Sequence, residues 1–106
     1  MTELRPNPTL RDLQDYFAAI CQERGWTKDS PPEKFVLFVE EVGELAKAIR
    51  KKTGLYHEAA KPNSLALEEE FADVLSYLLD LANCYNVDLE RAFRDKDAIN
   101  QKRYWT

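Results

Sequence analysis

Apolar residues recur at helical spacing in four separate stretches of the chain, and no stretch shows the strict alternation that is typical of a β-strand. The first stretch predicts a helix from about Leu10 to Arg24. Thr9 is suited to cap this helix because Asp12 follows it at capping-box spacing, and Gly25 is suited to end it.

The second stretch opens with Ser30-Pro31-Pro32-Glu33, which combines a capping box with proline in the first turn. It predicts a helix to about Lys52, where Gly54 provides a stop. Residues 53–63 are expected to form a loop. The remaining pattern predicts a third helix from about Leu65 to Cys84, capped by Ser64 or Asn63, and a fourth from its cap at Asp88 to about Lys102.

Four helices with short connections predict an all-α fold, an antiparallel helical bundle. The chain has 106 residues, only 3 Gly and 5 Pro, and no internal repeat, so we expect a single domain over residues 1–106. A domain of this size gains stability by burying further apolar surface against a second copy of itself. The bundle is therefore expected to be completed by homo-oligomerisation.

The formal net charge of -4 argues against a nucleic-acid-binding protein, whose affinity comes mainly from Lys and Arg on phosphates. It permits nucleotide binding, because a divalent metal can supply positive charge locally. No apolar run approaches the roughly 20 residues that span a bilayer, and the N-terminus lacks a signal-peptide core. Cys21 and Cys84 are isolated in helical patterns. We therefore expect a cytoplasmic protein with reduced thiols and no membrane partner.

Two acidic residues border the apolar face of the second helix, at about 100° per residue. Glu41 and Glu44 fall on one stripe with Leu37 and Ala48, beside that face rather than opposite it. The face itself comprises Phe35, Phe38, Val39, Val42, Leu45, Ala46 and Ile49. Carboxylates in such a place are costly unless something neutralises them.

The third helix repeats this arrangement, with Glu70 and Asp73 on the border of its apolar face. That core face comprises Leu67, Phe71, Val74, Leu75, Leu78, Leu81 and Ala82. If the two helices pack antiparallel, the acidic pairs can face each other, and without cations they would repel. Oxygen ligands of this kind favour Mg²⁺ or Mn²⁺. Mg²⁺ is commonly completed by substrate phosphates, which indicates phosphate-ester or anhydride chemistry.

Other interpretations of the acidic residues remain open. The segments EEVGE and EEEFAD can be solvated charged faces, and Glu40 can be either a further ligand or a solvent-facing residue. A di-iron carboxylate bundle requires Glu-x-x-His motifs on two helices. The single histidine, His57, falls in the predicted loop, so redox iron is disfavoured and His57 is expected to be a surface residue.

Taken together, these motifs resemble the MazG-like nucleoside triphosphate pyrophosphohydrolases. The segment from Glu40 to Leu45, followed by the segment from Glu70 to Leu75, resembles their EExxE…ExxD signature. The tail is similar to the KxxxNxxRY-like ending of small bacterial MazG-like proteins and of the dCTP pyrophosphatase branch. Its matching residues are Lys96, Asn100, Arg103 and Tyr104, and Trp26 fits the N-terminal part of the family.

The resemblance implies roles for these residues. Glu41, Glu44, Glu70 and Asp73 would bind Mg²⁺, or Mn²⁺ in its place, and would be the catalytic set that splits a nucleoside triphosphate into a monophosphate and pyrophosphate. Trp26, Lys96, Asn100, Arg103 and Tyr104 would bind the substrate. Family members assemble as homodimers or homotetramers.

One departure bears on the substrate. The dCTP pyrophosphatase branch has a second Trp where this chain has Lys51, and the nearby Tyr56 lies in the predicted loop. The preferred base therefore stays open. Two alternatives to a nucleoside triphosphate pyrophosphohydrolase also stay open. One is a non-catalytic helical interaction module, and the other is a metal-dependent hydrolase of another phosphorylated compound.

Overall fold

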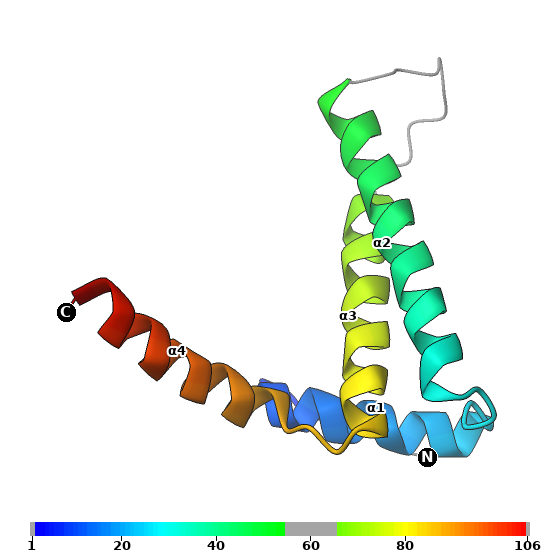
Figure 1. Ribbon diagram of the computed structural model, residues 1–106. Helices are drawn as coiled ribbons and strands as arrows, with labels where there is room; N and C mark the ends of the chain where they lie inside the picture. Colours follow the sequence, from blue (N-terminus) through cyan, green and yellow to red (C-terminus); the bar gives the residue numbers. More distant parts are fainter. Residues whose placement is uncertain (1, 55–65, 106) are drawn as a thin grey trace. The chain divides into compact units, whose positions relative to one another are not determined.

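The computed structural model describes residues 2–54 and 66–105, the side chains of Ala66, Tyr104 and Trp105 excepted. Within these ranges the chain forms four helices and no strand, which confirms the predicted all-α class (Figure 1). The helices are α1 (Leu10–Arg24), α2 (Pro31–Thr53), α3 (Ala66–Cys84) and α4 (Leu89–Trp105). The predicted loop begins within α2, at Thr53. Residues 55–63 of that loop, with Tyr56 and His57, and the predicted cap of the third helix lie outside the described residues.

The helix ends follow the local signals of the sequence. Thr9 and Asp12 form the predicted capping box of α1, and Ser30 and Glu33 form that of α2. Gly25 and Gly54 terminate the two helices with φ angles of 72° and 78°, in the left-handed region that glycine adopts without strain.

The connection between α3 and α4 also agrees with the prediction. Asn86 leaves the helical conformation with a φ of 55°, and the Oδ1 atom of Asp88 accepts a hydrogen bond from the backbone N–H of Arg91 at 3.1 Å. Asp88 therefore caps α4, which ends three residues beyond the expected Lys102, at Trp105.

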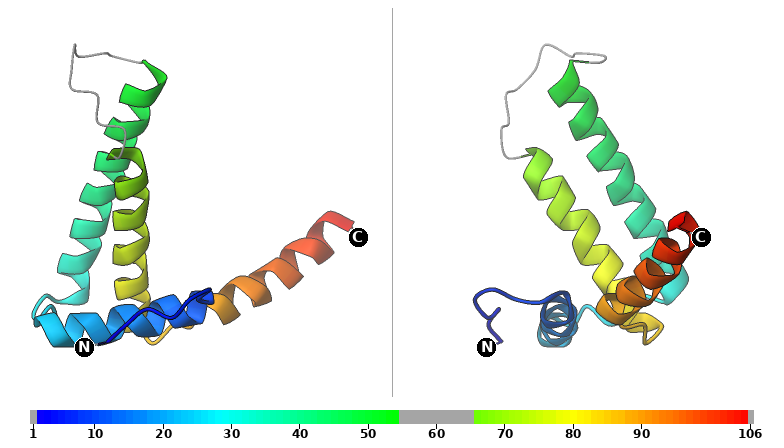
Figure 2. Two further views of the ribbon diagram at one scale, coloured as in Figure 1. Left: turned by 180° about the vertical axis from the view of Figure 1, so that it is seen from behind. Right: turned by 90° about the vertical axis from the view of Figure 1, so that its left-hand side faces the viewer.

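The chain divides into two compact units, Asp29–Leu78 and the combination of Met1–Lys28 with Leu79–Thr106. In the first unit, α2 and the larger part of α3 run side by side in opposite directions (Figures 1 and 2). This is the antiparallel arrangement that the sequence predicts for the two acidic helices.

Much of the apolar surface of α2 and α3 is exposed in the single chain. Phe35 and Phe71 are each 55% exposed, although Ala48 on the border stripe of α2 is buried. The exposed apolar face, as we call it, comprises Phe35, Val39, Val42, Ile49, Phe71, Leu75 and Leu78. The expectation that Phe71, Leu75 and Leu78 lie in a core is therefore wrong for one chain, because two adjacent helices cover only one side of each other.

The second unit is organised around Gln14, whose side chain is only 2% exposed. Its Nε2 group donates to Asn83 Oδ1 at 3.0 Å and to the carbonyl of Val87 at 2.6 Å, and its Oε1 atom accepts from the N–H of Leu89 at 3.0 Å. Asn83 returns a bond to the carbonyl of Gln14 at 3.1 Å. These bonds join α1 to the end of α3 and the start of α4.

Among the described residues, no helix is both long enough and apolar enough to cross a membrane.

Candidate metal centre

Three carboxylates from two helices converge in the unit Asp29–Leu78. Glu41 belongs to α2, whereas Glu70 and Asp73 belong to α3, and one carboxylate oxygen from each residue lies within 4.8 Å of the other two. Carboxylates this close to one another are favourable only when protonation or a cation reduces their repulsion.

Helical periodicity explains why these side chains meet. Glu70 and Asp73 are three residues apart, so both project from the same side of α3. Glu41 lies on the α2 stripe that also carries buried Ala48 and half-buried Leu37, and this stripe borders α3. The structure therefore brings together three of the four acidic residues that the sequence pattern places at the edges of two helices.

Glu70 has a buried oxygen that no hydrogen bond satisfies. Its Oε2 atom has no partner in the part of the chain that the structure describes. A buried carboxylate oxygen without a partner is costly, so this atom is suited to a ligand from outside the chain.

The environment of Glu41 disfavours its negative charge. Burial raises the pKa of Glu41 above its ordinary value, and the charges of Asp73, Glu70, Glu44 and Glu40 raise that pKa further, in this order. A divalent cation among these groups would reverse the effect, because it would favour the ionised form of Glu41.

Glu44 does not join the cluster of three, although the sequence predicts it as a fourth ligand. Its side chain is exposed on α2, and it acts on the cluster through its charge, which contributes to the raised pKa of Glu41. Glu40 is also exposed and makes the smallest of these contributions.

The donor set fits a hard divalent cation. It consists of carboxylate oxygens alone, with no cysteine or histidine in the cluster found among the described residues. Carboxylates are ligands for Mg²⁺ and Mn²⁺, whereas zinc and redox iron sites usually include Cys or His. Three carboxylates leave coordination positions for water or substrate oxygens.

Residues 34–103 match the MazG nucleotide pyrophosphohydrolase domain. The chain belongs to the MazG family. The matched segment includes Glu41, Glu70 and Asp73, so the carboxylate cluster lies within the part of the chain that defines the family.

This MazG chain is similar to dCTP pyrophosphatase 1 of Rattus norvegicus, with 40% identity over 103 aligned residues. The alignment covers 93% of this chain and 61% of the rat protein. dCTP pyrophosphatase 1 of Homo sapiens is 39% identical over 104 residues, with the same coverage of each chain. The chain therefore spans less than two thirds of the length of these relatives. The uncharacterized protein YvdC of Bacillus subtilis is 32% identical over 101 residues, which cover 90% of this chain and 95% of YvdC.

The predicted substrate-binding residues lie outside the unit that holds the carboxylates. They belong to the unit formed by Met1–Lys28 and Leu79–Thr106. Lys96 and Arg103 are exposed on α4, and Asn100 is half-buried there. The side chain of Tyr104 lies outside the described part. The roles of these residues, and that of Trp26, stay predictions from the family resemblance.

Trp26 follows the end of α1 and is 50% exposed. The guanidinium carbon of Arg24 lies 4.9 Å from the centroid of its ring, so a cation covers one face of the indole. Arg24 is the last residue of the predicted first helix and is not among the predicted site residues. The signal that could have singled it out is Gly25, because a left-handed residue at the helix end changes the direction of the chain between Arg24 and Trp26.

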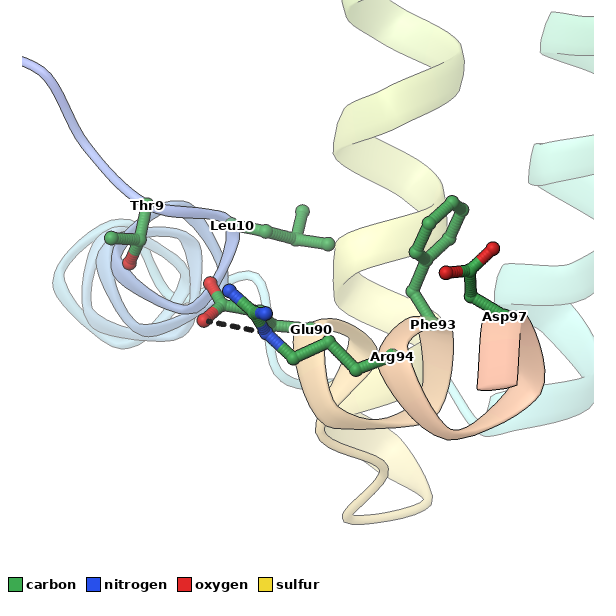
Figure 3. A pocket seen from close by; sticks show the side chains of 6 residues that line it. All are labelled: Thr9, Leu10, Glu90, Phe93, Arg94 and Asp97. Atoms are coloured by element: carbon green, nitrogen blue, oxygen red, sulfur yellow. Dashed lines mark ion pairs between the residues drawn. The ribbon is translucent and has the colours of Figure 1, made fainter. Parts of the chain in front are cut away.

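A surface hollow between the start of α1 and the first turns of α4 contains none of the predicted site residues. Leu10 and Phe93 flank it, and Arg94 pairs with Glu90 at 3.9 Å on its floor (Figure 3). Phe93 is 72% exposed, which shows that the hollow is open rather than enclosed.

Proposed function

We propose that this chain hydrolyses nucleoside triphosphates to the monophosphate and pyrophosphate, with a divalent cation held by Glu41, Glu70 and Asp73 and assisted by Glu44. The observation that carries the proposal is the convergence of three carboxylates around a buried Glu70 oxygen that has no partner among the described residues. Membership of the MazG family supports the reaction type.

The cluster of three carboxylates and Glu44 would have different roles in this reaction. The cluster of Glu41, Glu70 and Asp73 would hold Mg²⁺, or Mn²⁺ in its place, and when bound this cation supplies the positive charge that phosphate oxygens require. Glu44 adds negative charge near Glu41, and this charge would increase the affinity for the cation. The side chain of Glu44 would also accept a proton from an attacking water.

The names of two relatives support a deoxynucleotide as the substrate. The rat and human proteins are named dCTP pyrophosphatases, so dCTP is the first deoxynucleotide to test. Lys51 occupies the position of the second Trp of that branch, so the base preference of this chain can differ from theirs. We further propose that Lys96, Asn100, Arg103 and Tyr104 bind the phosphates or sugar, and that Trp26 contacts the base. A role in clearing unwanted deoxynucleotides from the cytoplasmic pool is consistent with this chemistry.

Self-association is part of the same proposal. Among the described residues, the buried apolar set consists only of Ile20, Cys21, Ala48, Leu79 and Ala82, and no large side chain is fully buried. Such a core is too small to stabilise a chain of this length. A homodimer, or a tetramer of two such dimers, that covers the exposed apolar face would complete the bundle.

We also propose that residues 1–106 act as one domain, because the family match over 34–103 includes residues of both compact units.

The decisive experiment incubates the purified chain with Mg²⁺ and each of the common nucleoside and deoxynucleoside triphosphates. Release of pyrophosphate together with the monophosphate supports the proposal. Release of orthophosphate would show that a different bond is cut, and turnover only of other phosphorylated compounds would favour the alternative hydrolase. No turnover at all would favour a non-catalytic interaction module. A parallel series with Mn²⁺ and with EDTA tests the cation requirement.

A further inference from the structure

The indole of Trp26 is presented by the turn that ends α1. The N–H of Trp26 donates to the carbonyl of Cys21 at 2.8 Å, and the N–H of Gly25 donates to the carbonyl of Gln22 at 3.3 Å. These two bonds, with the φ of 72° at Gly25, form a Schellman-type helix end. The backbone of Trp26 is thus fixed, while half of its surface stays exposed.

Arg24 occupies one face of this fixed ring. Its guanidinium carbon lies 4.9 Å from the ring centroid, which is within the range of a cation–π contact. A planar guanidinium stacks well on an aromatic face, and its presence restricts the rotation of the indole about its side-chain bonds. A flat partner from solution can then reach only the opposite face.

We propose that Arg24 is a positioning residue that holds Trp26 as a one-sided platform for the base of the nucleotide; this inference rests on the proposed function. A base that stacks on an indole already held in place loses less conformational freedom than one that must order the ring itself. Arg24 does not touch the base in this arrangement. Its contribution to binding passes entirely through the orientation of Trp26.

Loss of Arg24 should affect only one part of nucleotide recognition. Removal of Arg24 weakens the recognition of the base and leaves the recognition of the triphosphate unchanged. An arginine that bound phosphate directly would do the opposite, because its loss would weaken every ligand that carries a triphosphate. A base-free ligand such as inorganic triphosphate therefore separates the two roles.

The test uses Trp105→Phe as the parent chain, because the sequence contains only two tryptophans and this change leaves Trp26 as the single indole reporter. Arg24→Gln removes the cation, and Arg24→Lys keeps the charge without the planar group. Arg91→Gln is the matched control, because its side chain is 82% exposed and pairs only weakly with Asp95, 3.9 Å away on α4.

Three measurements are made on each variant. Quenching of Trp26 fluorescence by acrylamide reports how much of the indole is accessible, and it is expected to increase in Arg24→Gln. The dissociation constant of dCTP, from the change in Trp26 fluorescence, is expected to rise about two- to fivefold in Arg24→Gln, the range that an exposed cation–π contact supports. Arg24→Lys should recover part of this loss, whereas Arg91→Gln should match the parent. The dissociation constant of inorganic triphosphate, from its competition with dCTP in the same fluorescence titration, should be the same in all variants.

The outcomes distinguish this inference from the proposed function. Unchanged dCTP binding in Arg24→Gln, or an equal loss of dCTP and inorganic triphosphate, overturns the positioning role even if the parent chain hydrolyses nucleotides. A parent chain that binds dCTP through Trp26 without hydrolysing it contradicts the proposed function, and a selective loss of this dCTP binding in Arg24→Gln then still supports the role of Arg24. A parent chain that binds no nucleotide overturns both.

Discussion

Glu41 and Asp73 come from different helices, yet their carboxylate oxygens lie within 4.8 Å of each other and of an oxygen of Glu70. The side chains are held together by two antiparallel helices rather than by hydrogen bonds to each other. The folded chain therefore maintains a concentration of negative charge that a cation can relieve.

Glu41→Gln is expected to remove Mg²⁺ binding and to lower turnover by at least about 100-fold, because loss of a metal ligand should cost no less than loss of a residue that supports one. In the absence of metal, the variant should melt at the same temperature as the natural chain or above it, since one of the repelling charges is gone. Calorimetric titration with Mg²⁺, pyrophosphate release and thermal melting measure the three effects.

The control for this variant is Glu69→Gln, which removes an exposed carboxylate next to Glu70. It should bind Mg²⁺ and turn over nucleotides like the natural chain. If Glu41→Gln kept its affinity for Mg²⁺, the cluster of three would not be the metal centre.

Glu44→Gln is expected to separate binding from catalysis. Glu44 lies outside the cluster of three and influences Glu41 through its charge. We expect Glu44→Gln to abolish turnover, to weaken Mg²⁺ binding less than Glu41→Gln does, and to leave the fold intact. Circular dichroism, titration with Mg²⁺ and pyrophosphate release test the three parts. Turnover equal to that of the natural chain would show that Glu44 is not a ligand or a base.

The raised pKa of Glu41 predicts a pH-dependent stability of the metal-free chain. Between the ordinary pKa of 4.5 and the raised pKa in the folded chain, the folded state binds more protons at Glu41 than the unfolded state does. The free energy of unfolding contributed by this group therefore falls as the pH rises through that window. The depressed pKa values of Asp12, Glu23 and Glu33 act with the opposite sign, and their stabilisation is lost as the pH falls below their ordinary values.

Urea unfolding in EDTA at a series of pH values isolates the contribution of Glu41 when the natural chain is compared with Glu41→Gln. The difference in the free energy of unfolding between the natural chain and Glu41→Gln should change as the pH rises from 4.5 to the raised pKa of Glu41. At higher pH this difference should be constant. Mg²⁺ should remove the fall in the free energy of unfolding with rising pH, since the cation favours the ionised carboxylate. A difference that is independent of pH in EDTA would contradict the prediction.

Leu78→Lys tests whether a second chain covers the exposed apolar face. Leu78 is 40% exposed in one chain, so in a monomer this substitution should change stability by no more than about 0.5 kcal/mol. If a partner buries the face, the new charge should dissociate the assembly. Light scattering after size-exclusion chromatography gives the mass of the particle before and after the change.

The matched control is Glu69→Lys, which places the same side chain on the opposite side of α3 by helical periodicity. It should keep the assembly of the natural chain. A natural chain that is monomeric at all concentrations would reject the predicted oligomer outright.

Local signals explain which parts of this structure were predictable. The capping boxes at Thr9 and Ser30 and the glycines at positions 25 and 54 fix helix ends through contacts within a few residues, so the bounds of α1 and α2 were predicted closely. The cluster of Glu41, Glu70 and Asp73 was predictable because helical periodicity places each residue at the edge of an apolar face.

Features that depend on distant partners were not predictable in the same way. An apolar stripe does not reveal whether its own chain or a second chain covers it, which is why the exposure of Phe71 was missed. Glu44 has the same spacing signal as its neighbours, yet the direction in which its side chain points depends on the packing of α2. Gln14 occupies an ordinary polar position in a helical pattern, and its partners lie about 70 residues further along the chain.

Gln14→Leu tests whether this buried amide holds α1 to the connection between α3 and α4. The substitution removes three side-chain hydrogen bonds and leaves the N–H of Leu89, the carbonyl of Val87 and Oδ1 of Asn83 without their present partner. Because buried polar groups that lose a partner each cost about 1–3 kcal/mol, partly recovered by water, we expect a loss of about 2–4 kcal/mol in the free energy of unfolding. Chemical denaturation at one fixed chain concentration measures it, since self-association would otherwise shift the midpoint. Gln22→Leu, an exposed position on the same helix, should change the free energy by no more than about 0.5 kcal/mol. Equal effects of the two substitutions would mean that the Gln14 network adds no stability beyond that of an ordinary surface residue.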